Sequence, residues 1–273
     1  MNTIIQVSAG NGFSLCLDNQ GHVWGFGRNG DRQLGLGDNV IKRIPTLNRT
    51  LNNIIQISTG ESHSLCLDNQ GQVWGFGTNQ YGQLGLGDNQ DRAIPTLIPG
   101  LNNIVQVSCG DSHSLCVDNQ GRVWVFGGNH FGQLGLGDNI LRFSPTLNLS
   151  LNNIIQVSSG IYAFHSLCLN NEGRVWSFGS NNSGQLGIGT VYPSLVPLLI
   201  PNLNNINQVN IANDHSFCLD NQGQVWVFGG NTVGELGLGS TTYDRILSPM
   251  INPNLRNIIS IAAGKTHNLC IGL

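Results

Sequence analysis

Residues 71–87 read G-Q-V-W-G-F-G-T-N-Q-Y-G-Q-L-G-L-G, and close copies of this stretch recur along the chain. A fixed period of this size indicates one structural unit that is copied and stacked. The tryptophan of the G-x-V-W-x-F-G phrase recurs in steps of 50, 50, 52 and 50 residues, at Trp24, Trp74, Trp124, Trp176 and Trp226. A second phrase, S/N-L/F-C-L/V/I, keeps the same rhythm at Cys16, Cys66, Cys116, Cys168, Cys218 and Cys270.

The copy at residues 101–150 shows what one unit contains. Residues 103–108 alternate between apolar and polar side chains, which is the period of a strand. The D-N-Q-G segment at 118–121 has turn chemistry, and further strands are expected at 114–117, 123–127 and 145–147. Four short antiparallel strands with no helical period predict an all-β fold, in which each copy is one blade of a β-propeller.

The composition does not change along the chain, so we expect a single repeat domain over residues 1–273. The repeats fall at about 1–50, 51–100, 101–150, 151–203 and 204–255, with a partial copy at 256–273. The first two strands occur in six copies, whereas the third and fourth occur in five. The expected architecture is therefore a propeller of about six four-stranded blades, one of which is incomplete.

Charge and hydropathy exclude several classes of function. Only 10% of the residues are charged and the net charge is −3, with no run of Lys or Arg of the kind that nucleic-acid binding needs. No apolar stretch approaches the roughly 20 residues that span a bilayer, and Met1-Asn2-Thr3 leads into the repeat without a signal peptide. Repeated cysteines inside strand phrases predict buried free thiols, and hence a cytoplasmic or nuclear protein.

The direction of the chain sorts the loops of each unit into two groups. The G-x-x-H loop and the G-Q-L-G-L-G loop are expected at one end of the strands. The D-N-Q-G and L-N-N-I turns are expected at the other end. Function is expected among the longer and more variable loops of the first group.

These phrases resemble the repeat of the regulator of chromosome condensation family over essentially the whole chain. The second repeat carries them as G-E-S-H-S-L-C-L at residues 60–67, G-Q-V-W-G-F-G at 71–77 and G-Q-L-G at 82–85. The resemblance implies a β-propeller that works by binding proteins. The founding member is a guanine-nucleotide exchange factor for the small GTPase Ran. Other members are scaffolds, ubiquitin-ligase parts, an ultraviolet sensor or effectors that bacterial pathogens deliver into host cells.

The chain departs from this family in ways that narrow the expectation. The basic N-terminal tail that the founding member uses on chromatin is absent, and so is its long inserted hairpin. All five tryptophans belong to the repeat, which argues against photoreception.

Several residues of the loop end are candidate contacts with a protein partner. Asn213-Asp214-His215 is the single N-D-H phrase, and the resemblance implies that Asp214 contacts a GTPase; the alternative is an Asx-type cap of the loop. The longer loop of the fourth repeat adds Tyr162 and Phe164 as possible anchor residues for a bound protein, although Phe164 could also fold back between blades. Further candidates on the same face are Glu61, Asp111 and Lys265, with Tyr81, His130 and Phe131 extending the patch.

Catalytic, metal and cofactor chemistry is not expected. The recurring histidines are expected to make structural hydrogen bonds that tie each loop to its sheet. They are His63, His113, His165, His215 and His267. The glycine-rich loops open no helix and so do not resemble a phosphate cradle. No nucleophile elbow is present.

The last four residues, C-I-G-L at 270–273, fit a prenylation box in which the final leucine favours geranylgeranyl. Against this, Cys270 is also the strand cysteine of its repeat, and no polybasic second signal precedes it. Membrane association is therefore expected only if Cys270 carries a lipid, as a host-directed effector would.

The sequence thus predicts a protein-binding β-propeller that regulates a small GTPase, with nucleotide exchange on Ran as the specific hypothesis. The alternative is a non-catalytic scaffold whose loops bind another protein. Either is expected to act in the cytoplasm, or in the host cytosol if the protein is secreted by a pathogen.

Overall fold

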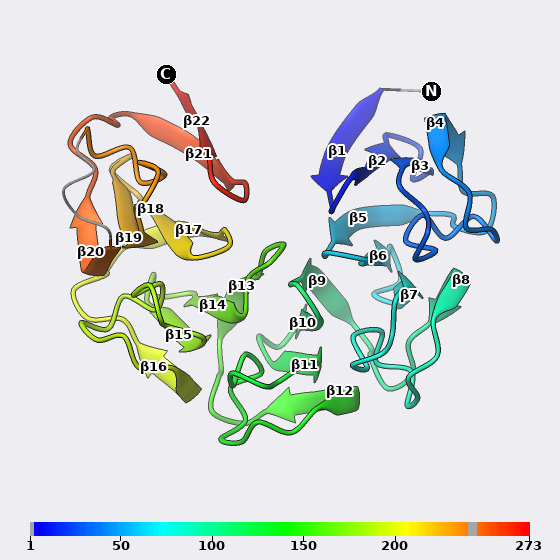
Figure 1. Cartoon of the computed structure of the whole chain (residues 1–273), viewed down its shortest axis with the longest axis horizontal. Helices are drawn as coiled ribbons and strands as arrows, with labels where there is room; N and C mark the ends of the chain where they lie inside the picture. Colours follow the sequence, from blue (N-terminus) through cyan, green and yellow to red (C-terminus); the bar gives the residue numbers. More distant parts are fainter. Residues whose placement is uncertain (1–2, 240–244) are drawn as a thin grey trace. The chain divides into compact units, whose positions relative to one another are not determined.

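The computed structural model describes residues 3–239 and 245–273 and shows an all-β fold (Figure 1). Within these residues no helix has the length and apolarity needed to cross a membrane. The chain divides into two compact units, residues 1–128 with 140–147 and residues 129–139 with 148–273, which are described separately. A single domain stays a prediction.

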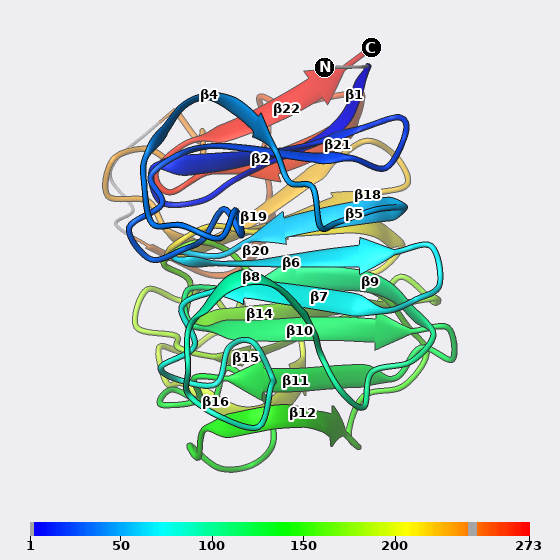
Figure 2. The ribbon, with the colours of Figure 1, turned by 90° about the vertical axis from the view of Figure 1, so that its right-hand side faces the viewer.

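Unit 1 contains three antiparallel four-stranded sheets, each with its strands in chain order. The first sheet is β1 (Ile4–Ala9), β2 (Phe13–Asp18), β3 (Val23–Gly27) and β4 (Lys42–Leu47). The second is β5 (Ile54–Thr59), β6 (His63–Asp68), β7 (Val73–Gly77) and β8 (Arg92–Leu97). The third is β9 (Ile104–Cys109), β10 (His113–Asp118), β11 (Val123–Gly127) and β12 (Arg142–Asn148). Figure 2 shows strands of unit 1 along their length, with the connecting loops gathered at the strand ends.

Unit 2 continues the pattern with two four-stranded sheets and a final two-stranded one. The fourth sheet is β13 (Ile154–Ser158), β14 (His165–Asn170), β15 (Val175–Gly179) and β16 (Ser194–Leu199). The fifth is β17 (Ile206–Ile211), β18 (His215–Asp220), β19 (Val225–Gly230) and β20 (Arg245–Ile251). The two-stranded sheet is β21 (Ile258–Ala263) with β22 (Asn268–Gly272), which confirms the predicted incomplete sixth blade.

The fourth strand of the third sheet begins earlier than the sequence predicted. We expected residues 145–147 in the third sheet, whereas β12 runs from Arg142 to Asn148 and has Pro145 in its interior. The sequence left open whether this proline stands at the start of the strand or at the edge of the sheet. The proline is tolerated here because β12 lies at the edge of its sheet, where one side of the strand needs no hydrogen-bond donor.

Glutamine side chains join the innermost strands of neighbouring sheets. In unit 1 the Gln6 amide donates to the carbonyl oxygen of Ile57 and accepts from the Ile57 backbone amide, both at 2.9 Å. In unit 2, Gln156 makes the same pair of bonds to Val209, and Gln208 makes it to Ile261. This explains the polar position within each apolar first strand. The glutamine side chain supplies a donor and an acceptor to backbone groups of the next sheet's first strand, which have no neighbouring strand on that side to pair with.

The hydrophobic core lies between sheets rather than within them. Leu15, Leu17 and Val23 of the first sheet pack with Ile57 and Phe76 of the second. Strands β6, β10, β14 and β18 are consequently buried at every position, because both of their faces are covered. The usual alternation of buried and exposed residues is lost in these strands.

The aspartate of the D-N-Q-G turn organises the other end of the first, second, third and fifth sheets. One Asp68 oxygen accepts from the backbone amides of Gln70 and Gln72, each at 2.9 Å. The other accepts from the indole nitrogen of Trp74 at 3.0 Å. The pairing of tryptophan with aspartate recurs at Asp18, Asp118 and Asp220. The equal spacing between the two phrases in these repeats therefore reflects one hydrogen-bonded turn.

The G-x-x-H histidine joins its sheet to the next one, whereas we expected it to tie the loop to its own sheet. His63 Nε2 lies 3.0 Å from Ser114 Oγ of the following sheet, and Ser114 donates to the Gln83 carbonyl oxygen at 2.8 Å. The same relay runs from His165 to Ser216 in unit 2. Burial lowers the pKa of His63 to about 3, so the ring is neutral at physiological pH.

The glycine of the G-x-x-H phrase is required because the imidazole lies against it. We expect Gly110→Ala to cost about 2 kcal/mol, since the new Cβ would overlap the ring of the fully buried His113. Urea denaturation followed by circular dichroism measures this. The matched control is Gly30→Ala, where no atom lies within 4 Å of the added carbon and little change is expected. Equal midpoints for the two variants would contradict the packing argument.

Candidate functional site

The loops that join first and second strands in unit 2 bring several predicted residues to one end of the sheets. These loops follow β13, β17 and β21, and they carry Tyr162, Asp214 and Lys265 respectively. The loop at residues 129–139 belongs to the same unit and reaches the first of them. We call this set of loops the unit 2 loop face.

Two ring contacts connect neighbouring loops of this face. The Lys265 ammonium lies 4.3 Å from the centre of the Tyr162 ring, a cation–π distance. The rings of Phe131 and Phe164 are tilted at 54° with centroids 5.3 Å apart. Phe164 therefore packs against a neighbouring loop residue and remains partly exposed. The sequence named these four side chains singly, but their pairing depends on the packing of sheets about 50 or 100 residues apart in the chain.

Asp214 is held by two side-chain amides. Its oxygens accept from Asn213 Nδ2 at 3.0 Å and from Gln185 Nε2 at 3.4 Å. Partial burial, and secondarily the carboxylate of Glu235, raise the pKa of Asp214 above its usual range. The negative charge of the ionised Asp214 carboxylate is therefore only partly balanced by its hydrogen bonds within the protein.

Glu235 follows β19 and lies near Asp214, and sequence reasoning missed it. It occupies the position of the glutamine in the G-Q-L-G phrase, so one copy reads G-E-L-G. Its side chain still accepts from a backbone amide two residues earlier, that of Val233, at 2.9 Å. The departure from the repeat was the available signal, and it places a second carboxylate near Asp214.

His215 lies beneath the surface. It is 1% exposed, and its Nε2 is 3.1 Å from Asn268 Oδ1 of the next sheet. Burial lowers its pKa, so it is neutral at physiological pH. Its role toward a partner would be to position Asp214 rather than to touch the partner.

Glu61 and Asp111 belong to unit 1. They occupy equivalent loops of the second and third sheets, and Asn11 donates to Glu61 Oε1 at 3.4 Å. Burial, and then the Glu61 carboxylate, raise the pKa of Asp111 to about 6. Tyr81 is also exposed in unit 1, and His130 is exposed in unit 2.

The cysteines are free thiols, and most are buried. Burial raises the pKa of Cys109 to about 12, which makes that thiol unreactive. Cys270 is partly buried in β22, where it pairs with Ile261 and packs on the core between the last two sheets.

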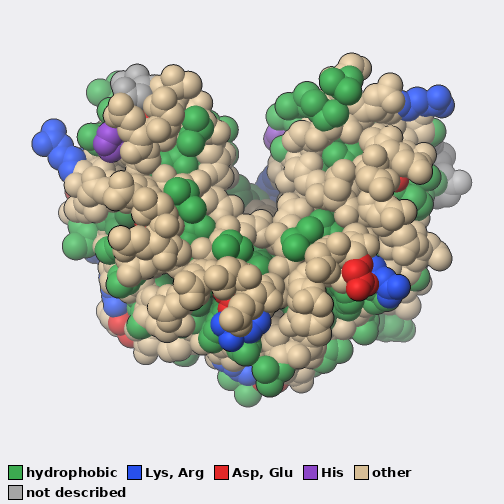
Figure 3. Space-filling view, turned by 180° about the vertical axis from the view of Figure 1, so that it is seen from behind, with side chains coloured by type: hydrophobic (Ala, Val, Ile, Leu, Met, Phe, Trp, Pro, Cys, Tyr) green, Lys and Arg blue, Asp and Glu red, His purple; other side chains and the backbone are tan. Residues whose placement is uncertain are grey.

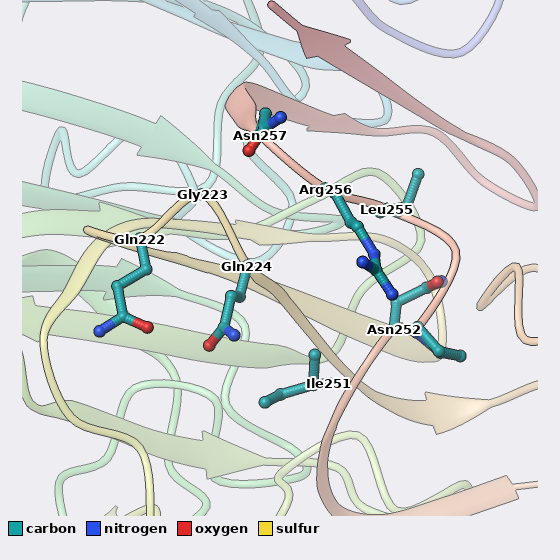
Figure 4. Close-up of a pocket in the computed structure, with 9 residues that line it drawn as sticks. Gln222, Gly223, Gln224, Ile251, Asn252, Leu255, Arg256 and Asn257 are labelled. Atoms are coloured by element: carbon teal, nitrogen blue, oxygen red, sulfur yellow. The ribbon is translucent and has the colours of Figure 1, made fainter.

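The turn end of unit 2 carries a hollow of about 410 Å³ (Figure 4). Gln222 and Gln224 extend from one turn, and Asn252 and Arg256 come from the segment opposite. Arg256 is the one charged residue in its lining.

Among the residues that the structure describes, no three His, Cys, Asp or Glu side chains are placed to hold a metal ion. On the face drawn in Figure 3, charged side chains are few and scattered.

Comparisons with known proteins agree with this architecture. A profile of the RCC1-like domain matches residues 1–270. Human WBSCR16 superposes with a TM-score of 0.87 at 24% identity, over 98% of this chain and 72% of that one. Prp20p of Saccharomyces cerevisiae superposes with a TM-score of 0.81 at 20% identity, over 99% of this chain and 83% of that one. A sequence search of curated proteins found no match.

The fold and the repeated interfaces define a β-propeller whose blades are antiparallel four-stranded sheets. The chain belongs to the RCC1-like family, as the resemblance of its phrases indicated.

The acidic pair of unit 1 makes stability depend on pH. The pKa of Asp111 is raised from 3.8 to about 6, so its contribution to stability is greatest below pH 4 and is lost as the pH rises through 6. We therefore expect Asp111→Asn to stabilise the protein at pH 7.5 by about 1 kcal/mol, with little effect at pH 4. This is less than the roughly 3 kcal/mol of an unscreened two-unit shift, because water still reaches the group.

Thermal unfolding at both pH values measures this change. Asp88→Asn is the control of opposite sign, because Arg92 lowers the pKa of Asp88 and its loss should destabilise at pH 7.5. A destabilising Asp111→Asn at pH 7.5 would refute the assignment.

Proposed function

We propose that this propeller binds a small GTPase through the unit 2 loop face and promotes release of its guanine nucleotide, with Ran as the target. Family membership supports a protein-binding role. Prp20p, which shares the fold, has been characterised for its binding to Gsp1p and histones. The observation that carries the proposal is the partly buried carboxylate of Asp214, on the same set of loops as two partly exposed ring contacts.

The chemistry follows from the raised pKa of Asp214. A carboxylate that its own protein compensates poorly gains from a positive group supplied by a partner. In a GTPase, such groups are the basic residues and the magnesium ion that hold the nucleotide phosphates. Competition for them would loosen the nucleotide. Tyr162, Phe131 and Phe164 would supply the apolar anchors that interfaces concentrate near their centres.

A non-catalytic scaffold is the second candidate. It is favoured by the short loops, since within residues 3–239 and 245–273 no additional hairpin projects from the loop ends of the sheets. A scaffold would use the same face, but would leave the nucleotide of its partner in place.

Release of a fluorescent guanine nucleotide from Ran tests the proposal. We expect micromolar protein to accelerate release, and Asp214→Ala to reduce that acceleration by about tenfold or more, because a charged contact is lost. Glu172→Gln is the matched control, since Glu172 is an exposed carboxylate on the turn at the opposite end of the strands. Unchanged release with the parent protein, or a fully active Asp214→Ala variant, would exclude exchange. Binding of Ran without release would support the scaffold.

Lipid attachment at Cys270 would place the proposed activity at a membrane of the host cytosol. It requires β22 to separate from β21, because the thiol lies in the middle of a paired strand and burial raises its pKa. If the terminus frays enough, expression in eukaryotic cells should yield an intact mass increased by one geranylgeranyl group, and Cys270→Ser should abolish the increase. The unmodified mass would end this part of the proposal.

A further inference from the structure

The hollow at the turn end of unit 2 holds an arginine that its own chain leaves unpaired. The lining comes from two segments of that unit, the turn at 222–224 and residues 251–257, which begin at the last residue of β20. In Figure 4 the side chains of Gln224 and Arg256 extend in the same direction from these two segments. Within residues 3–239 and 245–273, the Arg256 guanidinium has no hydrogen-bond or ion-pair partner.

Arg256 departs from the repeat. Its segment reads L-R-N-I at 255–258, whereas the four preceding copies all read L-N-N-I. The equivalent asparagines are Asn52, Asn102, Asn152 and Asn204, and each of them is exposed as Arg256 is. An asparagine is therefore sufficient for this connection between sheets, and the arginine is free to serve another purpose.

Two other arginines at the turns of the sheets each contact a carboxylate of their own turn. Arg122 Nε lies 2.7 Å from Asp118 Oδ2, and Arg174 Nε lies 3.8 Å from Glu172 Oε2. A guanidinium forms two parallel hydrogen bonds with a carboxylate, which is why this pairing recurs in proteins. The chain thus shows which group its turn arginines bind, and Arg256 lacks that group.

Hydrogen bonds fix both walls of the hollow before a ligand enters. Asp220 holds the turn by accepting from the backbone amides of Gln222 and Gln224, each at 2.9 Å. On the other wall, the buried side chain of Asn252 donates to a backbone carbonyl oxygen at 2.7 Å and accepts from the Asn254 amide at 2.9 Å. A preformed site loses less conformational entropy when it binds.

The side-chain amides of Gln222 and Gln224 add polar groups that are open to a ligand. In the part of the chain that the structure describes, neither amide has a hydrogen-bond partner. Ile251 and Leu255 supply apolar surface to the same lining. The hollow therefore combines one positive charge with carboxamides and aliphatic side chains, within about 410 Å³. This volume is in the range of small-ligand sites.

We propose that this hollow binds a carboxylate on a short aliphatic stem that leads to an amide, as in a glutamate residue. Arg256 would take the carboxylate, Gln222 and Gln224 would bond the amide, and Ile251 and Leu255 would contact the stem. A carboxylate fits better than a phosphate dianion, because Arg256 is the one charged residue of the lining.

The site is independent of the proposed GTPase contact, since it lies at the other end of the strands from the unit 2 loop face. Failure of the nucleotide-release assay would leave it untouched, and its own failure would leave that assay untouched.

An NMR titration of the isotope-labelled full chain tests the proposal. The probe is N-acetylglutamic acid α-amide, which carries one carboxylate. We expect a saturable shift of the Arg256 Nε–H signal with a midpoint in the millimolar range, because one charge-assisted contact at an exposed site is weak. The neutral isostere, N-acetylglutamine amide, should bind about tenfold more weakly or worse.

A second probe identifies the source of the carboxylate. The peptide acetyl-Gly-Glu-Gly-amide presents the same side chain within an extended backbone. Tighter binding of the peptide than of the single residue would support the proposal and assign the ligand to a protein. Equal binding would support it and assign the ligand to a free acid.

A variant of the protein that keeps the fold separates the site from general charge effects. Arg256→Asn restores the residue of the four preceding repeats, so the unfolding temperature should not change. We expect it to weaken binding about tenfold or more, as read from the side-chain amide signals of Gln222 and Gln224. The matched control is Arg49→Asn, at an exposed arginine after β4 in unit 1, which should bind like the parent.

Absence of a saturable shift at Arg256 with the glutamate derivative would overturn the proposal. Equal binding of the neutral isostere would do the same, since the carboxylate would then contribute nothing. An Arg256→Asn protein that binds as tightly as the parent would also overturn it.

Discussion

Each four-stranded sheet is too small to bury its own apolar side chains, so its stability depends on contact with the neighbouring sheet. The contact has three repeated parts. A phenylalanine ring packs against a loop glycine of the preceding sheet, as Phe126 does against Gly85. A histidine bonds to a serine that donates to a carbonyl oxygen, and a glutamine side chain bonds to a backbone. Because each part links one sheet to the next, stability is nearest-neighbour in character, as in other repeat proteins.

This dependence explains which positions are free to carry function. The histidine, the glycines and the serine of the second strand are committed to the interface between sheets. The residue just before the histidine is not restricted to one type, and it varies as Ser62, Ser112, Phe164, Asp214 and Thr266. Rigid sheets thus present variable loop residues at one end, which is how many scaffolds separate stability from recognition.

The fold class was predictable because the hydrophobic period and the turn phrases are local signals repeated at one spacing. The incomplete sixth blade was predictable for the same reason, since its third and fourth phrases are absent. The start of the fourth strand in the third sheet was placed at Pro145, three residues late, although its place at a sheet edge was among the two positions considered for the proline. The role of the histidine was predicted in kind but not in partner, because its hydrogen bond reaches a serine 51 residues away.

The candidate site also contains residues that the sequence could identify and residues that only the structure could. Asp214 was named from the resemblance of its N-D-H phrase to the family, and Tyr162 was named because its loop is two residues longer than the equivalent loops. Glu235 departs from the repeat, yet its significance depends on its approach to Asp214, which the chain order does not reveal. Local propensity and spacing specify what each unit becomes, since they act over a few residues. Which side chains share a face follows from the packing of sheets about 50 residues apart, because burial and the effect of charge depend on distance in space.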